Sequence, residues 1–171
     1  MNKLRDILWE AEFITKPYSV IINAIYTLRN GIYRAICSLS TQITGDVLDF
    51  GCGSKPHEKI FKEVNSYVGV DIAFSGYEHS GSKIDFFYDG ITLPFSDNSF
   101  DSVVCFDVLV HVFNIDWVMA KITRVLKPGG KFLVSVPFAW DEYEIPYDCA
   151  RYTSYGLESM FKKIIFLLKS Q

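Results

Sequence analysis

The chain has 171 residues, a length that predicts one domain with a substantial hydrophobic core. Its residues are 49% apolar and its charges are spread throughout, a composition that excludes a disordered protein. The net charge is −3 and no basic block is present, which argues against bulk nucleic-acid binding. The four cysteines form no C-x-x-C pair, so zinc or redox spacing is absent and we expect a cytoplasmic protein.

Residues 1–44 are predicted to form an N-terminal helical cap. Apolar residues recur at helical spacing between Tyr18 and Leu39, which predicts an amphipathic helix packed on the domain. Its uninterrupted apolar part is too short to cross a bilayer, so we expect no membrane span, although a helix lying on a membrane surface stays an alternative. Acidic residues near the N-terminus argue against a signal peptide, namely Asp6, Glu10 and Glu12.

From residue 45 onwards, short apolar strands alternate with helices. This alternation predicts an α/β fold with a doubly wound, Rossmann-like, mostly parallel sheet, in which a ligand binds beyond the carboxyl ends of the strands. The glycines of the Lys127–Gly130 turn are expected to supply positive φ angles after the second helix. The expected strands are Asp46–Phe50, Tyr67–Ile72, Lys83–Tyr88, Ser102–Phe106 and Phe132–Val136, and the expected helices are Ser54–Val64 and Ile115–Leu126.

The run VLDFGCGSKP, Val47 to Pro56, indicates a ligand loop at the end of the first strand. Glycines between a strand and a helix let a ligand approach the backbone closely, as in sites for dinucleotides and for S-adenosylmethionine (SAM). Pro56 occupies the third glycine position of the dinucleotide fingerprint, which weakens that alternative, and the nucleoside triphosphate loop motif is missing. Asp49 would repel a pyrophosphate but attract a ligand that carries an ammonium and a sulfonium group.

Two further carboxylates end the next two strands. Asp71 closes the second strand, where it could accept hydrogen bonds from both hydroxyls of a ribose, which NAD and SAM both carry. Asp89, followed by Gly90, ends the third strand. It could accept from an adenine amino group, or it could form an ordinary Asp-Gly turn.

Four runs in order resemble the class I SAM-dependent methyltransferases, specifically the small-molecule group often called type 11. They are VLDFGCGSKP, YVGVDIAFSGY, DGITLPFSDNSFDSVVCFDVLVHV and ITRVLKPGGKFLVSVPF, and they cover about Val47 to Phe138. The resemblance implies a SAM-binding core over residues 45–138. The implied cofactor-binding residues are Gly51, Cys52 and Gly53 under the methionine part, Asp49 near its ammonium, Asp71 and Ile72 at the ribose, Asp89 and Gly90 at the adenine, and Phe106 and Asp107 along the methionine side.

A second run, PYDCARYTSYGLESMF, is similar to the tail of a subgroup linked to sugar and cell-surface polysaccharide gene clusters. The resemblance implies that residues 139–171 form a lid and a C-terminal helix, and that the methyl acceptor is a small molecule or a glycan. Tyr147, Asp148 and Arg151 are the candidate substrate residues, although the last two could simply pair to order the lid. His111 is the candidate catalytic base, with a histidine bonded to backbone as the alternative.

The tail departs from the family pattern, in which two more strands usually follow the last helix. Helical spacing predicts a helix to about residue 168, with Ser154 or Thr153 as its N-cap, while a short strand at Ile164–Leu168 is the alternative. With a helix there, the fifth strand becomes an exposed edge, which suggests a homodimer through that edge or the tail. A protein that binds SAM without turnover, acting as an interaction module, is the second hypothesis for function, and a nucleotide-dependent oxidoreductase is the third.

Overall fold

The computed structural model describes residues 26–73, 83–139 and 141–169. Most of the predicted N-terminal cap and the loop over residues 74–82 lie outside these ranges. The α-helices are α3 (Tyr26–Leu39), α4 (Ile115–Val125) and α5 (Ser154–Lys169), and the short 3₁₀ turns are η1 (Ser40–Gln42), η2 (Glu58–Ile60) and η3 (Leu109–His111). The strands are β1 (Gly45–Phe50), β2 (Val64–Ile72), β3 (Phe86–Tyr88), β4 (Phe100–Phe106) and β5 (Leu126–Ser135).

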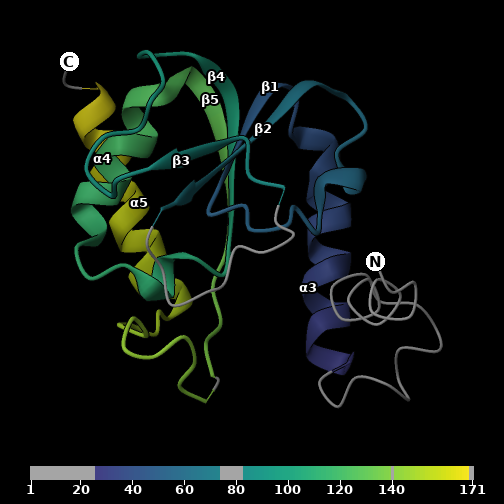
Figure 1. Ribbon diagram of the computed structural model, residues 1–171, viewed down its shortest axis with the longest axis vertical. Coiled ribbons are helices and arrows are strands. Elements are labelled where there is room, and N and C mark those ends of the chain that lie inside the picture. The colour runs from purple at the N-terminus through teal and green to yellow at the C-terminus, as the bar shows by residue number, and fades with distance from the viewer. Residues whose placement is uncertain (1–25, 74–82, 140, 170–171) are drawn as a thin grey trace.

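The described strands form one parallel sheet in the order β3-β2-β1-β4-β5. The chain runs outward from β1 to β3, then returns to place β4 against the other side of β1, so strand order reverses between β1 and β4. Helix α3 covers one face of the sheet, while α4 and α5 cover the other (Figure 1). The predicted doubly wound α/β fold is therefore confirmed.

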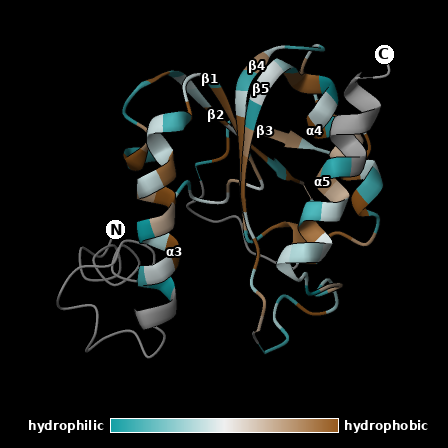
Figure 2. Ribbon diagram, turned by 180° about the vertical axis from the view of Figure 1, so that it is seen from behind, coloured by the Kyte–Doolittle hydropathy of each residue, from teal (hydrophilic) through white to brown (hydrophobic). Residues whose placement is uncertain are grey.

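Two apolar clusters hold these layers together, one on each face of the sheet. Successive side chains of β1 point to opposite faces, so Leu48 and Phe50 join the cluster under α4, while Val47 joins the cluster under α3. The four residues from Val47 to Phe50 are all buried, as expected for a central strand covered on both sides. Ile32 and Ile36 of α3 pack in the same cluster as Val47 and Val104 of the sheet, and Figure 2 colours the ribbon by hydropathy. Within the described residues, no helix is long and apolar enough to cross a membrane.

The predicted helix over Ser54–Val64 is wrong. Turns follow β1, the single 3₁₀ turn η2 is the only helical element described there, and β2 already begins at Val64, which pairs with Gly45. Lys55 adopts a φ of +54°, whereas a right-handed helix needs a φ of about −60°. The backbone at Lys55 is therefore incompatible with a helix that begins at Ser54.

The turn at Lys127–Gly130 differs in part from the expectation. Helix α4 ends at Val125 as expected, but the turn residues already belong to the irregular start of β5, where the pairing with β4 shifts register. Only Gly129 has a positive φ, +77°. At Gly130 the reason for glycine is steric, because a Cβ there would lie 2.7 Å from the side chain of Leu126.

The tail forms helix α5, which confirms the helical prediction over the strand alternative. The Thr153 hydroxyl accepts a hydrogen bond from the Gly156 amide at 3.0 Å, so Thr153 is the N-cap. Phe161 of α5 packs edge-on against Phe132 of β5, with ring centroids 5.7 Å apart. Strand β5 lies at one edge of the described sheet.

Candidate functional site

The residues predicted to bind a cofactor gather at the carboxyl edge of the sheet. Gly51 follows β1, Asp71 lies near the end of β2, Asp89 follows β3 and Asp107 follows β4. Because all these strands are parallel, their carboxyl ends meet at one edge, and the edge includes the point where strand order reverses. The structure therefore brings the predicted cofactor residues to one side of the molecule.

The glycine loop after β1 is closed by bonds within the protein. The amides of Gly51 and Cys52 donate to the Val70 carbonyl at 2.8 and 3.2 Å, and the Gly53 amide donates to Asp71 Oδ2 at 2.8 Å. Gly51 and Gly53 have φ values of +73° and +48°, a region that favours glycine. A Cβ at Gly51 would also overlap the methyl groups of Val108. The glycines are thus required by backbone conformation and, at Gly51, by a close neighbour.

Two of the predicted carboxylates already bind backbone amides. Asp71 Oδ1 accepts from the Ile72 amide at 2.8 Å, so its two oxygens join the glycine loop to the end of β2. Asp89 Oδ1 accepts from the amides of Ile91 and Thr92 at 2.8 and 2.9 Å, and these bonds, that to Thr92 first, lower the pKa of Asp89. Asp89 therefore does form a turn that includes Gly90.

Asp49 lies in β1, two residues before Gly51, and is 4% exposed. Its Oδ2 accepts a hydrogen bond from the Tyr67 hydroxyl at 2.8 Å. Burial raises the pKa of Asp49 to about 7, against the lowering effects of the Tyr67 hydroxyl and the Lys55 ammonium. Small changes in local charge therefore decide whether this carboxylate is ionised near neutral pH.

The sequence reasoning missed Tyr67 and Lys55 as partners of Asp49. Tyr67 is the first residue of the predicted second strand. In the sheet it pairs with Val47 of β1, which lies two residues before Asp49 on the same strand. Two positions is the repeat of a strand face, so this register could have indicated the contact. Lys55 gave only a weak signal, namely a lysine between the loop glycines and a proline.

Phe106 and Asp107 end β4 but face different surroundings. The ring of Phe106 packs edge-on against His57, at 5.1 Å between centroids, and is stacked with Phe61 at 6.3 Å. Asp107 has a φ of +59° and accepts from the Ser135 hydroxyl at 2.9 Å. Burial raises the pKa of Asp107.

His111 ends η3 and contacts the segment after β5. Its Nδ1 lies 3.2 Å from the Tyr147 carbonyl oxygen, its Nε2 lies 3.7 Å from Glu144 Oε2, and its ring meets Tyr143 edge-on at 4.7 Å between centroids. The amides of Cys149 and Ala150 both donate to the Val110 carbonyl, at 2.8 and 3.0 Å. The segment thus lies across η3, and His111 Nδ1 contacts a backbone carbonyl of this segment.

Asp148 and Arg151 pair with each other within this segment. Both guanidinium Nη atoms donate to the Asp148 carboxylate, and Asp148 Oδ2 also accepts from the Tyr143 amide at 3.1 Å. The Arg151 side chain holds the pKa of Asp148 down at about 2. This pair orders the segment itself, whereas Tyr147 is half-exposed.

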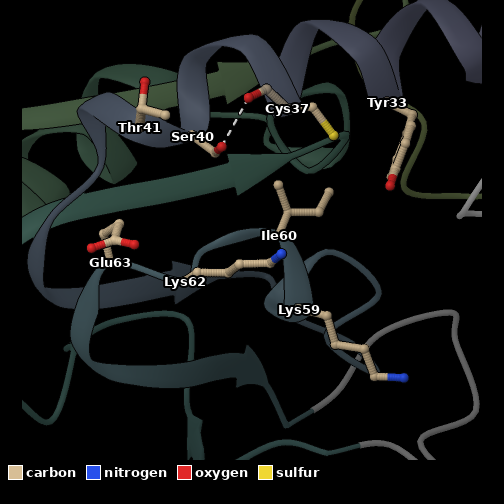
Figure 3. Close-up of a pocket in the computed structure, with 8 residues that line it drawn as sticks. All are labelled: Tyr33, Cys37, Ser40, Thr41, Lys59, Ile60, Lys62 and Glu63. Carbon is tan, nitrogen blue, oxygen red and sulfur yellow. Dashed lines mark hydrogen bonds between the residues drawn. The ribbon is translucent and has the colours of Figure 1, made fainter.

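A groove of about 540 Å³ lies on the face of the sheet that α3 covers, between α3 and the η2 region (Figure 3). Ser40 and Thr41 precede β1, and Lys62 and Glu63 precede β2, so this groove opens toward the amino ends of those strands. It is separate from the carboxyl edge. Its lining residues are Tyr33, Cys37, Ser40, Thr41, Lys59, Ile60, Lys62 and Glu63.

Comparisons with known proteins agree with this geometry. A family model described as a methyltransferase domain matches residues 48–134. The chain is 36% identical over 110 residues to a sterol 24-C-methyltransferase of Gibberella zeae, covering 57% of this chain and 29% of that protein. It is 37% identical over 143 residues to an uncharacterised protein of Methanocaldococcus jannaschii, covering 80% of this chain and 61% of the relative.

Solved structures support the fold. The YcgJ protein of Bacillus subtilis superposes with a TM-score of 0.60 at 19% identity, over 77% of this chain and 68% of that one. The chain spans less than a third of the length of the sterol methyltransferase above.

Proposed function

This chain belongs to the methyltransferase domain family, and we propose that it transfers a methyl group from SAM to a small molecule or a glycan. The observation that carries the proposal is the closed loop Gly51–Gly53, with the Asp49 carboxylate just before it and Asp71 bonded to it, at the edge where strand order reverses. This arrangement offers a close backbone approach together with negative charge, which suits a cationic ligand rather than a diphosphate.

Each strand end takes one part of the cofactor in this proposal. The loop residues Gly51, Cys52 and Gly53 pass under the methionine part, and Asp49 attracts its ammonium. The remaining roles are Asp71 and Ile72 at the ribose, Asp89 and Gly90 at the adenine, and Phe106 and Asp107 along the methionine side. Free cysteines at all four positions suit a reducing compartment, and we place the activity in the cytoplasm.

Bound SAM would supply an electrophilic methyl group on a sulfonium. The protein then has two tasks, which are to hold the acceptor in line with that methyl carbon and to remove a proton from a hydroxyl or amine. His111 is the base in this proposal. With Nδ1–H donating to the Tyr147 carbonyl, its Nε2 carries the lone pair that accepts the proton. Glu144, 3.7 Å away, stabilises the imidazolium that results.

The lid residues form the acceptor side in this proposal. Tyr147 presents a half-exposed ring that suits a sugar or a flat ring. Asp148 and Arg151 hold the lid in shape through their mutual pair, and their role toward the acceptor is indirect. The strand β5 edge or the C-terminal tail stays our predicted homodimer surface, and light scattering on the purified chain tests it, because a monomer at micromolar concentration would contradict it.

Calorimetry with S-adenosylhomocysteine and with NADH tests the cofactor. We expect saturable binding of the first at micromolar concentration and none of the second. Binding of NADH alone would replace this proposal with the oxidoreductase hypothesis.

The second candidate function is SAM binding without turnover. The contacts that favour it are those of His111, whose two ring nitrogens both face lid groups. Release of S-adenosylhomocysteine in the presence of a panel of sugars and small alcohols or amines separates the two functions. Binding without any release across the panel supports the second.

A further inference from the structure

Lys55 has an unusual position directly after the glycine loop. It is a lysine with a φ of +54°, a conformation that costs a residue with a Cβ about 1 kcal/mol. Its amide closes a turn by donating to the Cys52 carbonyl at 2.8 Å. Although lysine is rarely buried, Lys55 is only 7% exposed. A strained backbone and a buried ammonium persist together only where the surroundings hold the side chain in place.

The Lys55 side chain crosses β2 at Gly69. A Cβ on Gly69 would overlap Lys55 Cε and Cys52 Sγ, so this glycine leaves the passage through which the lysine runs. Beyond it, Lys55 Nζ meets Asp85 Oδ2 at 2.5 Å, and the same oxygen accepts from the Gly69 amide at 2.6 Å. One side chain therefore joins the glycine loop, the middle of β2 and the residue before β3.

The Lys55 ammonium also lies among carboxylates. The charged and titratable groups that act on Asp49 are Tyr67 and Asp71 from β2, Glu58 from η2, and Lys55. Lys55 is the cation of this set, and its attraction favours the ionised form of Asp49, while Asp71 and Glu58 oppose it. Since burial already raises the pKa of Asp49 to about 7, loss of this cation would favour the protonated form of the carboxylate further.

We propose that Lys55 is a positioning residue of the cofactor site, which anchors the glycine loop through Asp85 and keeps Asp49 negative, so that the site selects ligands bearing an ammonium group. The inference rests on the proposed function above. Lys55 acts through Asp49 and the loop, and it does not itself contact the reacting atoms.

The test compares two ligands that differ in that ammonium group. S-adenosylhomocysteine carries it, whereas 5′-methylthioadenosine keeps the adenosine and thioether but lacks the amino acid. Calorimetry at pH 7 on Lys55→Met, which keeps most of the stem, is expected to show roughly tenfold or greater loss of affinity for S-adenosylhomocysteine. Affinity for methylthioadenosine should fall by less than about threefold. Lys62→Met, the same change at an exposed position, should bind both ligands like the wild type.

The pH dependence of binding distinguishes this role from a purely structural one. The pH at which S-adenosylhomocysteine affinity reaches half its maximum should move upward in Lys55→Met, because a cation near Asp49 is lost. In Glu58→Gln it should move downward, because an anion that opposes the ionisation of Asp49 is lost while Lys55 keeps its charge. A structural defect alone would not shift the two midpoints in opposite directions. If Lys55→Met fails to fold, Lys55→Gln, which removes the charge but keeps a polar end, takes its place in both measurements.

Three outcomes would overturn the inference. They are unchanged S-adenosylhomocysteine affinity in folded Lys55→Met, equal losses for both ligands, or midpoints that move the same way in both variants. If the wild type binds neither ligand, the proposed function fails and the inference fails with it.

Discussion

Two crossover connections between parallel strands differ sharply in this protein. Between β4 and β5 the chain forms the full helix α4, whose Asn114 N-cap accepts from the Trp117 amide at 3.2 Å and whose apolar residues fill the core. Between β1 and β2 it forms turns and η2 only, and two polar side chains are buried there, Lys55 and His57, whereas α4 buries one, Lys121. Buried polar groups cost free energy unless they are paired, whereas buried apolar groups stabilise the fold. Helix α4 therefore contributes mainly stability, while the candidate site residues lie in the η2 crossover and in the turns, Asp107 and η3, that precede α4.

His57 illustrates the difference. It falls within the helix expected over Ser54–Val64, which the structure does not form. His57 is buried against Phe106, and burial lowers its pKa to about 4. The short crossover turns the side chain inward instead.

The largest expected effect is on stability and concerns helix α4. Ile122 is 1% exposed in the core under α4, so Ile122→Ala should lower the free energy of unfolding by about 2–4 kcal/mol. Urea denaturation measures it, and Phe113→Ala, at a 94% exposed position nearby, should change stability by less than about 0.5 kcal/mol. Affinity for S-adenosylhomocysteine should stay within about twofold when Ile122→Ala is folded. A large loss of binding would mean that the two crossovers are not separate in role.

Asp49→Asn should make the protein more stable while it weakens cofactor binding. The pKa of Asp49 is raised in the folded state to about 7 from an ordinary value of 3.8. Its contribution to stability is therefore fully present below about pH 4 and is lost as pH rises through 7, a loss on the order of a few kcal/mol. Asparagine does not titrate, so the variant should gain stability over the wild type as pH rises from 4 to 8, measured by urea denaturation at each pH. A constant difference across that range would contradict the assignment.

Substitutions at the two loop glycines separate packing from backbone strain. Gly51→Ala places a Cβ into Val108 at a φ of +73°, whereas nothing lies within 4 Å of a Cβ at Gly53, with its φ of +48°. We expect Gly51→Ala to cost about 2–3 kcal/mol and Gly53→Ala about 1 kcal/mol, the second from strain alone. Thermal unfolding compares them. Equal losses would show that Val108 moves aside freely.

The smallest expected effect concerns the lid. Arg151→Lys removes the bidentate ion pair with Asp148 but keeps the positive charge. Hydrogen exchange of the Cys149 and Ala150 amides, which donate to Val110, should become roughly tenfold faster. Exchange in helix α4 should not change. Unaltered exchange at the two lid amides would show that the pair does not hold the lid on η3.

The sequence by itself indicated the strands, their parallel pairing and a candidate ligand loop after the first of them. Apolar runs without alternation predict buried strands, and glycines after the first of them predict a ligand loop, because these signals depend on residues close together in the chain. The N-cap at Thr153 and the turn at Asp89 are equally local. Four motifs in order were sufficient to indicate the family.

Only the tertiary structure decided what surrounds Asp49 and the loop. The bond from Tyr67 to Asp49 and the path of Lys55 over Gly69 to Asp85 join segments 16 to 30 residues apart. No periodicity reports such contacts, because they depend on strand register and on the space that one missing Cβ leaves. The charge on Asp49 likewise follows from burial and from neighbours that the fold brings together, and local sequence carries no record of either.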